Sequence, residues 1–156
     1  MRPLLAILIL TAACMRDPYD RYAGAVRSDA GASRAMVAQV VTRLQSTVVH
    51  GHVPPDSAKV WSATLTEASK ELTQHADHLA QLGPPDATLA RTHAALLTEI
   101  RQVADTLNSI ASSMSDPTVA SGAFSRLLQG TQYTQDEIRW TEQRAARQLA
   151  THGIIL

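Results

Sequence analysis

The stretch QHADHLAQLGPPDATLARTH, residues 74–93, decides the fold because it contains the end of one helix, a turn and the start of the next. Gly83 fits the position just past a helix end, where the backbone turns left-handed. Pro85 fits a first helical turn, where the missing N–H costs no hydrogen bond, and Asp86 puts negative charge near the positive end of the helix dipole. The stretch therefore predicts a helical hairpin with one histidine on each side of its turn.

Two similar breaks divide the rest of the chain: HGHVPPDS at 50–57 and SDPT at 115–118. Gly51 fits a helix end, and Pro55 and Pro117 fit first helical turns. The helices expected between the breaks run over residues 18–49, 55–82, 86–114 and 118–152. Helices joined by such short connections make antiparallel neighbours, so the chain predicts an all-α, up-down-up-down antiparallel four-helix bundle.

Each expected helix carries a seam of apolar and small residues at steps of three and four, close to the 3.5-residue period of helices packed at small angles. In the first two helices the seams are Val26, Ala30, Ser33, Val37, Val41, Leu44 and Val48, and Trp61, Leu65, Ala68, Leu72, His75, Leu79 and Leu82. In the last two they are Leu89, His93, Leu96, Ile100, Val103, Leu107, Ile110 and Met114, and, more polar, Phe124, Leu127, Thr131, Thr134, Ile138, Thr141, Ala145 and Leu149. These residues form the predicted core.

His75 and His93 are predicted to share one layer of that core. Residues at one level of an antiparallel pair have a constant sum of residue numbers, and a sum of 168 brings the seams of the second and third helices into register. Sums near 105 and 231 place Ser33 of the first helix and Ile138 of the fourth close to the histidine level. The first helix has small residues here, AGASRA at 30–35, so the layer has space for water, an ion or a ligand.

Two interpretations of the histidine layer stay open. In the first, the imidazoles form a structural polar layer and hydrogen-bond to each other, to Ser33, to Thr134 or to water, because burying them unpaired costs about 1–3 kcal/mol each. In the second, they bind a transition metal or a small ligand, with His78, Asp77 or Glu137 as further contacts, since bundle cores hold such sites. The spacing matches no known metal motif, so the structural interpretation is favoured and no cofactor is expected.

Composition narrows the function classes. At 156 residues, with 45% apolar and 4% aromatic side chains, the chain fits one domain whose core is built from Leu, Val, Ile and Ala. The formal net charge is +0 and there is no strongly basic stripe, so nucleic-acid binding through phosphates is not favoured. Gly-x-Ser-x-Gly, Walker and HExxH patterns are absent from the sequence, so we expect no enzyme.

The first fourteen residues, MRPLLAILILTAAC, have the layout of an export signal: a positive start, an apolar run and small residues. The apolar run is about 10 residues, or roughly 15 Å of helix, too short for a bilayer core of about 30 Å. The stretch resembles a bacterial lipoprotein signal, although Leu10 stands one place earlier than the usual leucine. That resemblance implies cleavage before Cys14 and attachment of lipid to it. The alternatives are an ordinary signal peptide or a short buried N-terminal helix.

The lipoprotein interpretation divides the chain into a signal peptide at 1–13, a lipidated tether at 14–17, the bundle at 18–152 and a C-terminal tail at 153–156. The mature protein is then expected in the bacterial cell envelope, held to the membrane by lipid on Cys14 and facing the periplasm or the exterior. Met15, rather than an aspartate, follows the cysteine. By the sorting convention of lipoproteins this favours the outer membrane, where there is one.

The stretch QYTQDEIRWTEQRAARQ, residues 132–148, is the most polar part of the fourth helix that also carries aromatic residues. Its Tyr133, Trp140, Arg144 and Arg147 are expected to lie outside the seam. Aromatic residues and arginine are favoured at interface hot spots, so these four residues are a candidate partner surface. The alternative is a solvated face with Trp140 packed against a neighbouring helix.

The hairpin itself is similar to one in many small, uncharacterised exported helical proteins of bacteria, on the residues Leu82, Pro84, Pro85, His93, Leu96 and Leu97. The similarity covers about a third of the chain, and it implies the fold and no activity. We therefore expect a membrane-anchored, non-enzymatic interaction module or accessory subunit of an envelope complex, with a protein partner. The alternative is a periplasmic bundle that binds a transition metal or small ligand at His75 and His93.

Overall fold

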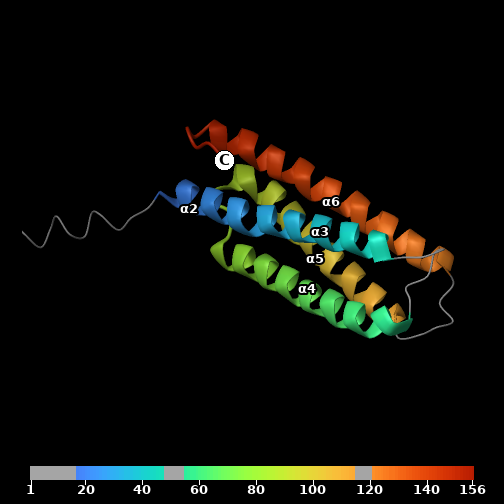
Figure 1. The fold of residues 1–156 in the computed structure, drawn as a ribbon. Helices are drawn as coiled ribbons and strands as arrows, with labels where there is room; N and C mark the ends of the chain where they lie inside the picture. Colours follow the sequence, from blue (N-terminus) through green and yellow to red (C-terminus); the bar gives the residue numbers. More distant parts are fainter. Residues whose placement is uncertain (1–16, 48–54, 115–120) are drawn as a thin grey trace, which may run out of the picture.

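The computed structural model describes residues 17–47, 55–114 and 121–156, and the side chains of 55, 56 and 121–127 lie outside that description. Every regular element in these ranges is helical: α2 (Pro18–Ala25), the π-helical segment η2 (Val26–Ala30), α3 (Gly31–Thr47), α4 (Pro55–Leu82), α5 (Ala87–Ser113) and α6 (Ser121–Ala150). Figure 1 shows α2, η2 and α3 as one continuous rod beside the three other helices. The predicted all-α four-helix bundle is confirmed.

The turn between α4 and α5 forms as its residues predict, with one difference. Gly83 has a φ of 68°, and its N–H donates to the carbonyl oxygen of Leu79 at 3.1 Å, which ends α4. Asp86 caps α5: its Oδ1 accepts a hydrogen bond from the backbone N–H of Leu89 at 3.0 Å. Pro85 therefore precedes the cap and does not lie in the first helical turn. Gly51 and Pro117 lie outside the described residues.

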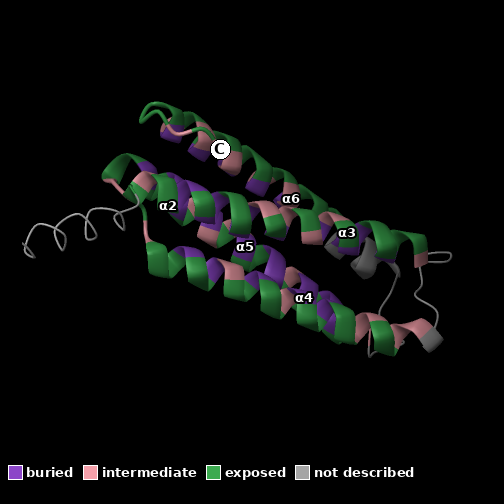
Figure 2. Ribbon diagram, turned by 60° about the vertical axis from the view of Figure 1, so that its left-hand side comes forward, coloured by how far each residue is buried: buried purple, intermediate pink, exposed green. Residues whose placement is uncertain are grey.

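The predicted seams form the core of the described part of the chain, with one systematic exception. All seam positions with described side chains are buried in α2–α3 and α6, and so are those of α5 from Leu89 to Ile110. In α4 the core position falls on Ala76, and His75 is only half-buried. Trp61 is also half-buried, and Leu82 is exposed. Figure 2 shows the buried residues on the inward sides of the helices.

The inward side of α6 owes its polar character to threonines that are buried with their hydroxyl groups hydrogen-bonded. Thr134 donates to the carbonyl oxygen of Gly130 at 2.9 Å, and Thr141 donates to Oε1 of Glu99 on α5 at 2.8 Å. A hydroxyl that bonds within its own helix or to a neighbouring helix can be buried without losing its hydrogen bond. The weak apolar seam of the fourth helix is therefore still a core face.

The register of the α4–α5 hairpin differs from the predicted sum of 168. Ser62 Oγ donates to the carbonyl oxygen of Ala111 at 3.0 Å, and Arg101 contacts Asp77 at 3.1 Å; these pairs sum to 173 and 178. The turn explains the shift, because Asp86 is extended (φ −152°, ψ 175°) and each proline holds the preceding residue away from helical geometry. The chain thus travels past the end of α4 before α5 begins.

Candidate functional site

His75 is held by the helix that packs against α4. Its Nδ1 lies 2.9 Å from Oγ of Ser33 on α3, and the same Ser33 hydroxyl donates to the carbonyl oxygen of Asp29 at 2.6 Å. A hydroxyl has one proton to give, so both contacts are satisfied only when His75 donates its Nδ1–H to Ser33. The predicted hydrogen bond between this imidazole and Ser33 is confirmed.

His93 lies elsewhere in the core, against Tyr22 of α2. The two ring centroids are 5.7 Å apart with the planes at 48°, and His93 is 6% exposed. Burial lowers the pKa of His93 below its ordinary value and raises the pKa of Tyr22 to about 12. Within the described part of the chain, neither His93 Nδ1 nor the Tyr22 hydroxyl has a hydrogen-bond partner. His93 therefore lies in an aromatic contact, in surroundings that favour the neutral form of its imidazole.

The predicted His75–His93 layer is wrong, and the hairpin register is the reason. With a sum of 173, the level of His75 on α5 is five residues beyond His93, which is about 7.5 Å along the helix axis. The α5–α6 pairs Thr92–Gln148 and Glu99–Thr141 both sum to 240, against the expected 231. The register between the first and second helices is close to the prediction, since the residue numbers of the Ser33–His75 pair sum to 108 and the predicted sum was near 105.

Replacing His93 with leucine is expected to leave stability at pH 7 unchanged or raised and to flatten its dependence on pH. A lowered pKa in the folded state means that the contribution of His93 is present above the unfolded value of about 6.5 and is lost as pH falls below it. One such site changes the unfolding free energy by at most about 1.4 kcal/mol per pH unit. Urea unfolding of the wild type and His93→Leu between pH 7.5 and 5 measures this.

His93→Gln is the matched control, because it removes the titration but keeps a buried polar group; it should flatten the pH profile and be less stable than His93→Leu. In a double variant of His93→Leu and His75→Leu, the two changes in unfolding free energy should add, since separate sites add within about 0.5 kcal/mol. An unchanged pH profile in both His93 variants, or strong coupling to His75, would contradict the structure's placement of His93.

The other residues proposed as metal contacts do not converge on His75 and His93. His78 Nδ1 lies 2.7 Å from Oδ2 of Asp29 in the π-helical segment η2. Asp77 is engaged by Arg101, and Glu137 accepts a hydrogen bond from the hydroxyl of Tyr133, which raises the pKa of that phenol. The pairing of His78 with Asp29 was not predicted, because no sequence signal marks the π-helical insertion that carries Asp29.

A second unpredicted cluster joins three segments at the end of the bundle where α2 begins. Tyr19 donates to Oδ2 of Asp86 at 2.8 Å, and its ring stacks on His152 with centroids 4.1 Å apart. His152 Nε2 lies 3.4 Å from the same carboxylate oxygen. The hydrogen bonds from the Leu89 backbone N–H and from Tyr19 hold the pKa of Asp86 below its ordinary range. The cluster ties the first helix to the start of α5 and the end of α6.

Tyr133, Trp140, Arg144 and Arg147, which we name the α6 face, lie outside the core as predicted. Tyr133 is 67% and Trp140 62% exposed, and both arginines are exposed. The two aromatic residues are seven positions apart, about two helical turns, so they share one side of α6. The alternative in which Trp140 packs against a neighbouring helix does not hold, because most of its surface is open to solvent.

Glu99 lies beside the α6 face, between α5 and α6, and sequence reasoning missed it. Its Oε1 accepts from Thr141, while its Oε2 is buried without a partner in the described part of the chain. Burial is the main cause that raises the pKa of Glu99, and the negative charge of Glu137 raises this pKa further. The hydrogen bond from Thr141 and the positive charge of Arg144 lower it. The carboxyl group thus couples electrically to the helix that carries the exposed aromatic residues.

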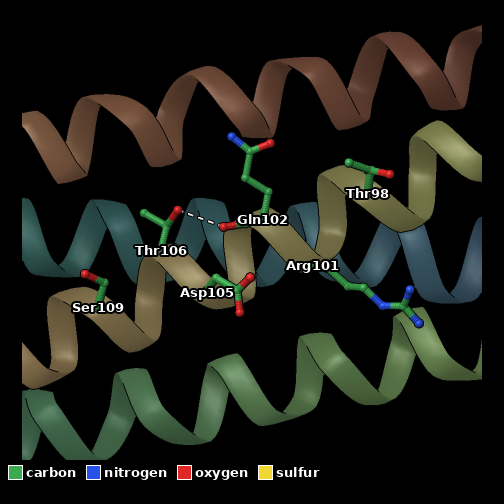
Figure 3. Close-up of a pocket in the computed structure, with 6 residues that line it drawn as sticks. All are labelled: Thr98, Arg101, Gln102, Asp105, Thr106 and Ser109. Atoms are coloured by element: carbon green, nitrogen blue, oxygen red, sulfur yellow. Dashed lines mark hydrogen bonds between the residues drawn. The ribbon is translucent and has the colours of Figure 1, made fainter.

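The outer side of α5 forms a shallow depression, shown in Figure 3, that offers no converging chemistry. It is lined by Thr98, Arg101, Gln102, Asp105, Thr106 and Ser109, all from this one helix. Arg101 is paired with Asp77, and Thr106 donates to the backbone oxygen of Gln102 at 2.7 Å. Side chains on one exposed helix side point outward rather than toward a common point, so we assign no site here.

Within the described ranges, no group of three or more His, Cys, Asp or Glu side chains is placed to hold a metal ion. The helices described also include none that is long and apolar enough to span a bilayer. No protein-family model, curated protein or solved structure matches the chain.

Proposed function

We propose that the protein is a lipid-anchored module of the bacterial cell envelope that binds a protein partner through the α6 face and catalyses no reaction. The observation that carries this proposal is the pair of large aromatic side chains, Tyr133 and Trp140, that are more than half exposed on one side of α6. Tryptophan, tyrosine and arginine are the residues most enriched at interface hot spots. In a chain with 4% aromatic residues, two exposed on one helix side form a notable surface.

The mixed charge of this part of α6 favours a protein partner over a lipid surface. Exposed Arg144 and Arg147 are accompanied on the same helix by Asp136 and Glu137. Surfaces that bind anionic lipids are rich in lysine and arginine on their polar side. Protein interfaces, in contrast, combine aromatic residues and arginine with a polar rim.

The expected anchor gives the α6 face a position relative to the membrane. Cys14 lies outside the described residues and is four positions before Pro18, where α2 begins, so the tether spans about 14 Å at most. Tyr19 stacks on His152, which places the end of α6 beside the start of α2. Trp140 is ten residues before the end of α6 at Ala150, or about 15 Å. A partner on this surface is therefore an envelope protein close to the same membrane, the outer one by the proposed sorting.

Truncating Trp140 to alanine is expected to weaken capture of that partner from detergent-solubilised membranes by about thirtyfold, because hot-spot residues contribute about 2 kcal/mol or more. Tyr133→Ala should weaken it in the same direction. The measurement is quantitative affinity capture with each purified variant at several concentrations. Both positions are exposed, so melting temperatures should stay near the wild type.

Val60→Ala is the matched control, since Val60 is 66% exposed on α4 and lies away from the α6 face. It should capture the same protein with wild-type affinity. Equal loss in Val60→Ala and Trp140→Ala would show that capture is non-specific, and full retention in the Trp140 and Tyr133 variants would overturn the assignment of the α6 face.

A further inference from the structure

His75 and His78 lie on one side of α4 and both are held from the same neighbouring helix. Residues three apart in a helix are surface neighbours, with Cβ atoms about 5–6 Å apart. His75 contacts Ser33 of α3, and His78 contacts Asp29 of η2. These two holding residues are themselves linked, because the Ser33 hydroxyl donates to the Asp29 backbone oxygen at 2.6 Å.

The hydrogen bonds fix which ring nitrogen of each histidine carries the proton. The Asp29 carboxylate can only accept, so His78 donates its Nδ1–H at 2.7 Å. His75 donates its Nδ1–H to Ser33, whose single proton is used on Asp29. In a neutral imidazole with the proton on Nδ1, the lone pair is on Nε2. Both rings therefore present Nε2 as the atom able to bind a ligand.

In the His78–Asp29 pair the carboxylate is buried and the imidazole is exposed, an arrangement that suits ligand binding by the imidazole. The carboxylate is the buried partner, at 10% side-chain exposure, while the imidazole is 62% exposed. Burying a carboxylate costs free energy, and a short π-helical segment, a kind of insertion often found at functional sites, carries this one. A buried carboxylate that orients an exposed imidazole through Nδ1 is the arrangement found behind metal-binding histidines.

We propose that His75 and His78 bind a divalent first-row transition metal ion, such as Cu²⁺ or Zn²⁺, through their Nε2 atoms. Asp29 and Ser33 are positioning residues that fix the tautomer and orientation of the two rings. The described chain places no third His, Cys, Asp or Glu ligand with them, so solvent completes the coordination. A pair of imidazoles binds Cu²⁺ more tightly than Zn²⁺ in the usual order of metal affinity. This site is independent of the α6 face.

The other histidines set the controls. His93 is buried against Tyr22, and His152 is stacked on Tyr19 beside Asp86, so neither belongs to this site. His50 and His52 lie outside the described residues and are the competing ligands that a test must remove, as is the thiol of Cys14. The test therefore uses the full chain in detergent with a background of Cys14→Ser, His50→Gln and His52→Gln.

The experiment titrates this background protein with Cu²⁺ alone, by calorimetry and by electron paramagnetic resonance. The expected result is one Cu²⁺ per chain with two nitrogen ligands. His75→Gln and His78→Gln should each weaken binding at least tenfold, and Asp29→Asn should weaken it less while keeping both nitrogen ligands. His152→Gln should bind as the background does. Zn²⁺ should raise the melting temperature of the background protein and not of His78→Gln, which lacks one of the two proposed ligands.

Three results would overturn the proposal. One is the absence of stoichiometric Cu²⁺ binding in the background protein when the chain with His50 and His52 restored does bind, which assigns the metal to those two histidines. The second is unchanged affinity in both His75→Gln and His78→Gln. The third is failure of the background protein to bind Cu²⁺ while its melting curve matches the wild type.

Discussion

Truncating Leu72 or Leu96 to alanine is expected to lower the free energy of unfolding by about 2–5 kcal/mol. Both side chains are fully buried, at 0% exposure, in a core whose described apolar residues are aliphatic apart from Tyr22. Truncation removes buried methyl groups and leaves a cavity, because the closely packed residues around it relax only partly. Urea or thermal unfolding of each purified variant measures the loss.

The double variant of Leu72 and Leu96 also tests the hairpin register. In the sequence-predicted register these two leucines face each other, and contacting residues couple by about 0.5–3 kcal/mol. In the structure, the level of Leu72 is displaced from Leu96 by five residues, about 7.5 Å along the helix axis, so the two losses should nearly add. Leu97→Ala, at a partly buried position, is the control and should lose less. Strong coupling, or unchanged melting in both single variants, would contradict the structure.

The register of the α4–α5 hairpin could not be predicted, because the seam positions are compatible with more than one register. Apolar residues recur every three or four positions along both seams, so sliding one seam along the other again brings apolar residues close to apolar residues, and the pattern does not single out one register. The choice is made by the turn, where Asp86 is extended after two prolines and carries the chain beyond the end of α4. This turn shifts α5 along α4 by five residues relative to the predicted register, and the shift separates His75 from His93.

The core position of α4 that was predicted at His75 is occupied by Ala76, and the cause is different from that of the register. A strict 3.5-residue period places position 75 on the seam, but a straight α-helix has 3.6 residues per turn and drifts by about 20° per heptad. By the last turns of the 28-residue helix α4, the inward position has moved to Ala76. The small side chain fills the core, and His75 moves to the boundary, where it reaches Ser33.

The α6 face was predictable, whereas the His78–Asp29 pair was not. The exposure of Tyr133 and Trp140 follows from their angular distance from the seam of the same helix, which the sequence alone defines. The position of Asp29 depends on a π-helical segment, which changes the directions of side chains around the helix. No residue from Val26 to Ala30 predicts that this segment is π-helical. Contacts that join distant segments, such as Tyr19 with Asp86 and His152, likewise appear only once the helices are packed.

Replacing Cys14 with serine is expected to abolish stable membrane attachment of the mature chain. The proposed anchor is a thioether-linked lipid, and a serine hydroxyl cannot take the place of the thiol in that linkage. The chain should then appear either as an unprocessed precursor or as a protein released from the membrane. Each CH₂ group of a lipid chain that enters the membrane contributes about 0.8 kcal/mol to binding, and stable anchoring takes more than one acyl chain. Loss of the lipid therefore removes nearly all of the free energy that holds the mature chain to the membrane. Fractionation and incorporation of labelled fatty acid measure the effect.

The control for this variant is Met15→Ser, which changes the neighbouring residue and keeps the thiol, so it should be lipidated and remain with the membrane. The melting curve of the Cys14→Ser protein should match that of the wild-type chain, because the described bundle begins at Pro18 and its first fully buried apolar residue is Tyr22. A folded but released protein would separate anchoring from folding. Normal processing and attachment of Cys14→Ser would instead show that the apolar run from Leu4 to Leu10 is not a lipoprotein signal, and the membrane-proximal position of the α6 face would lose its support.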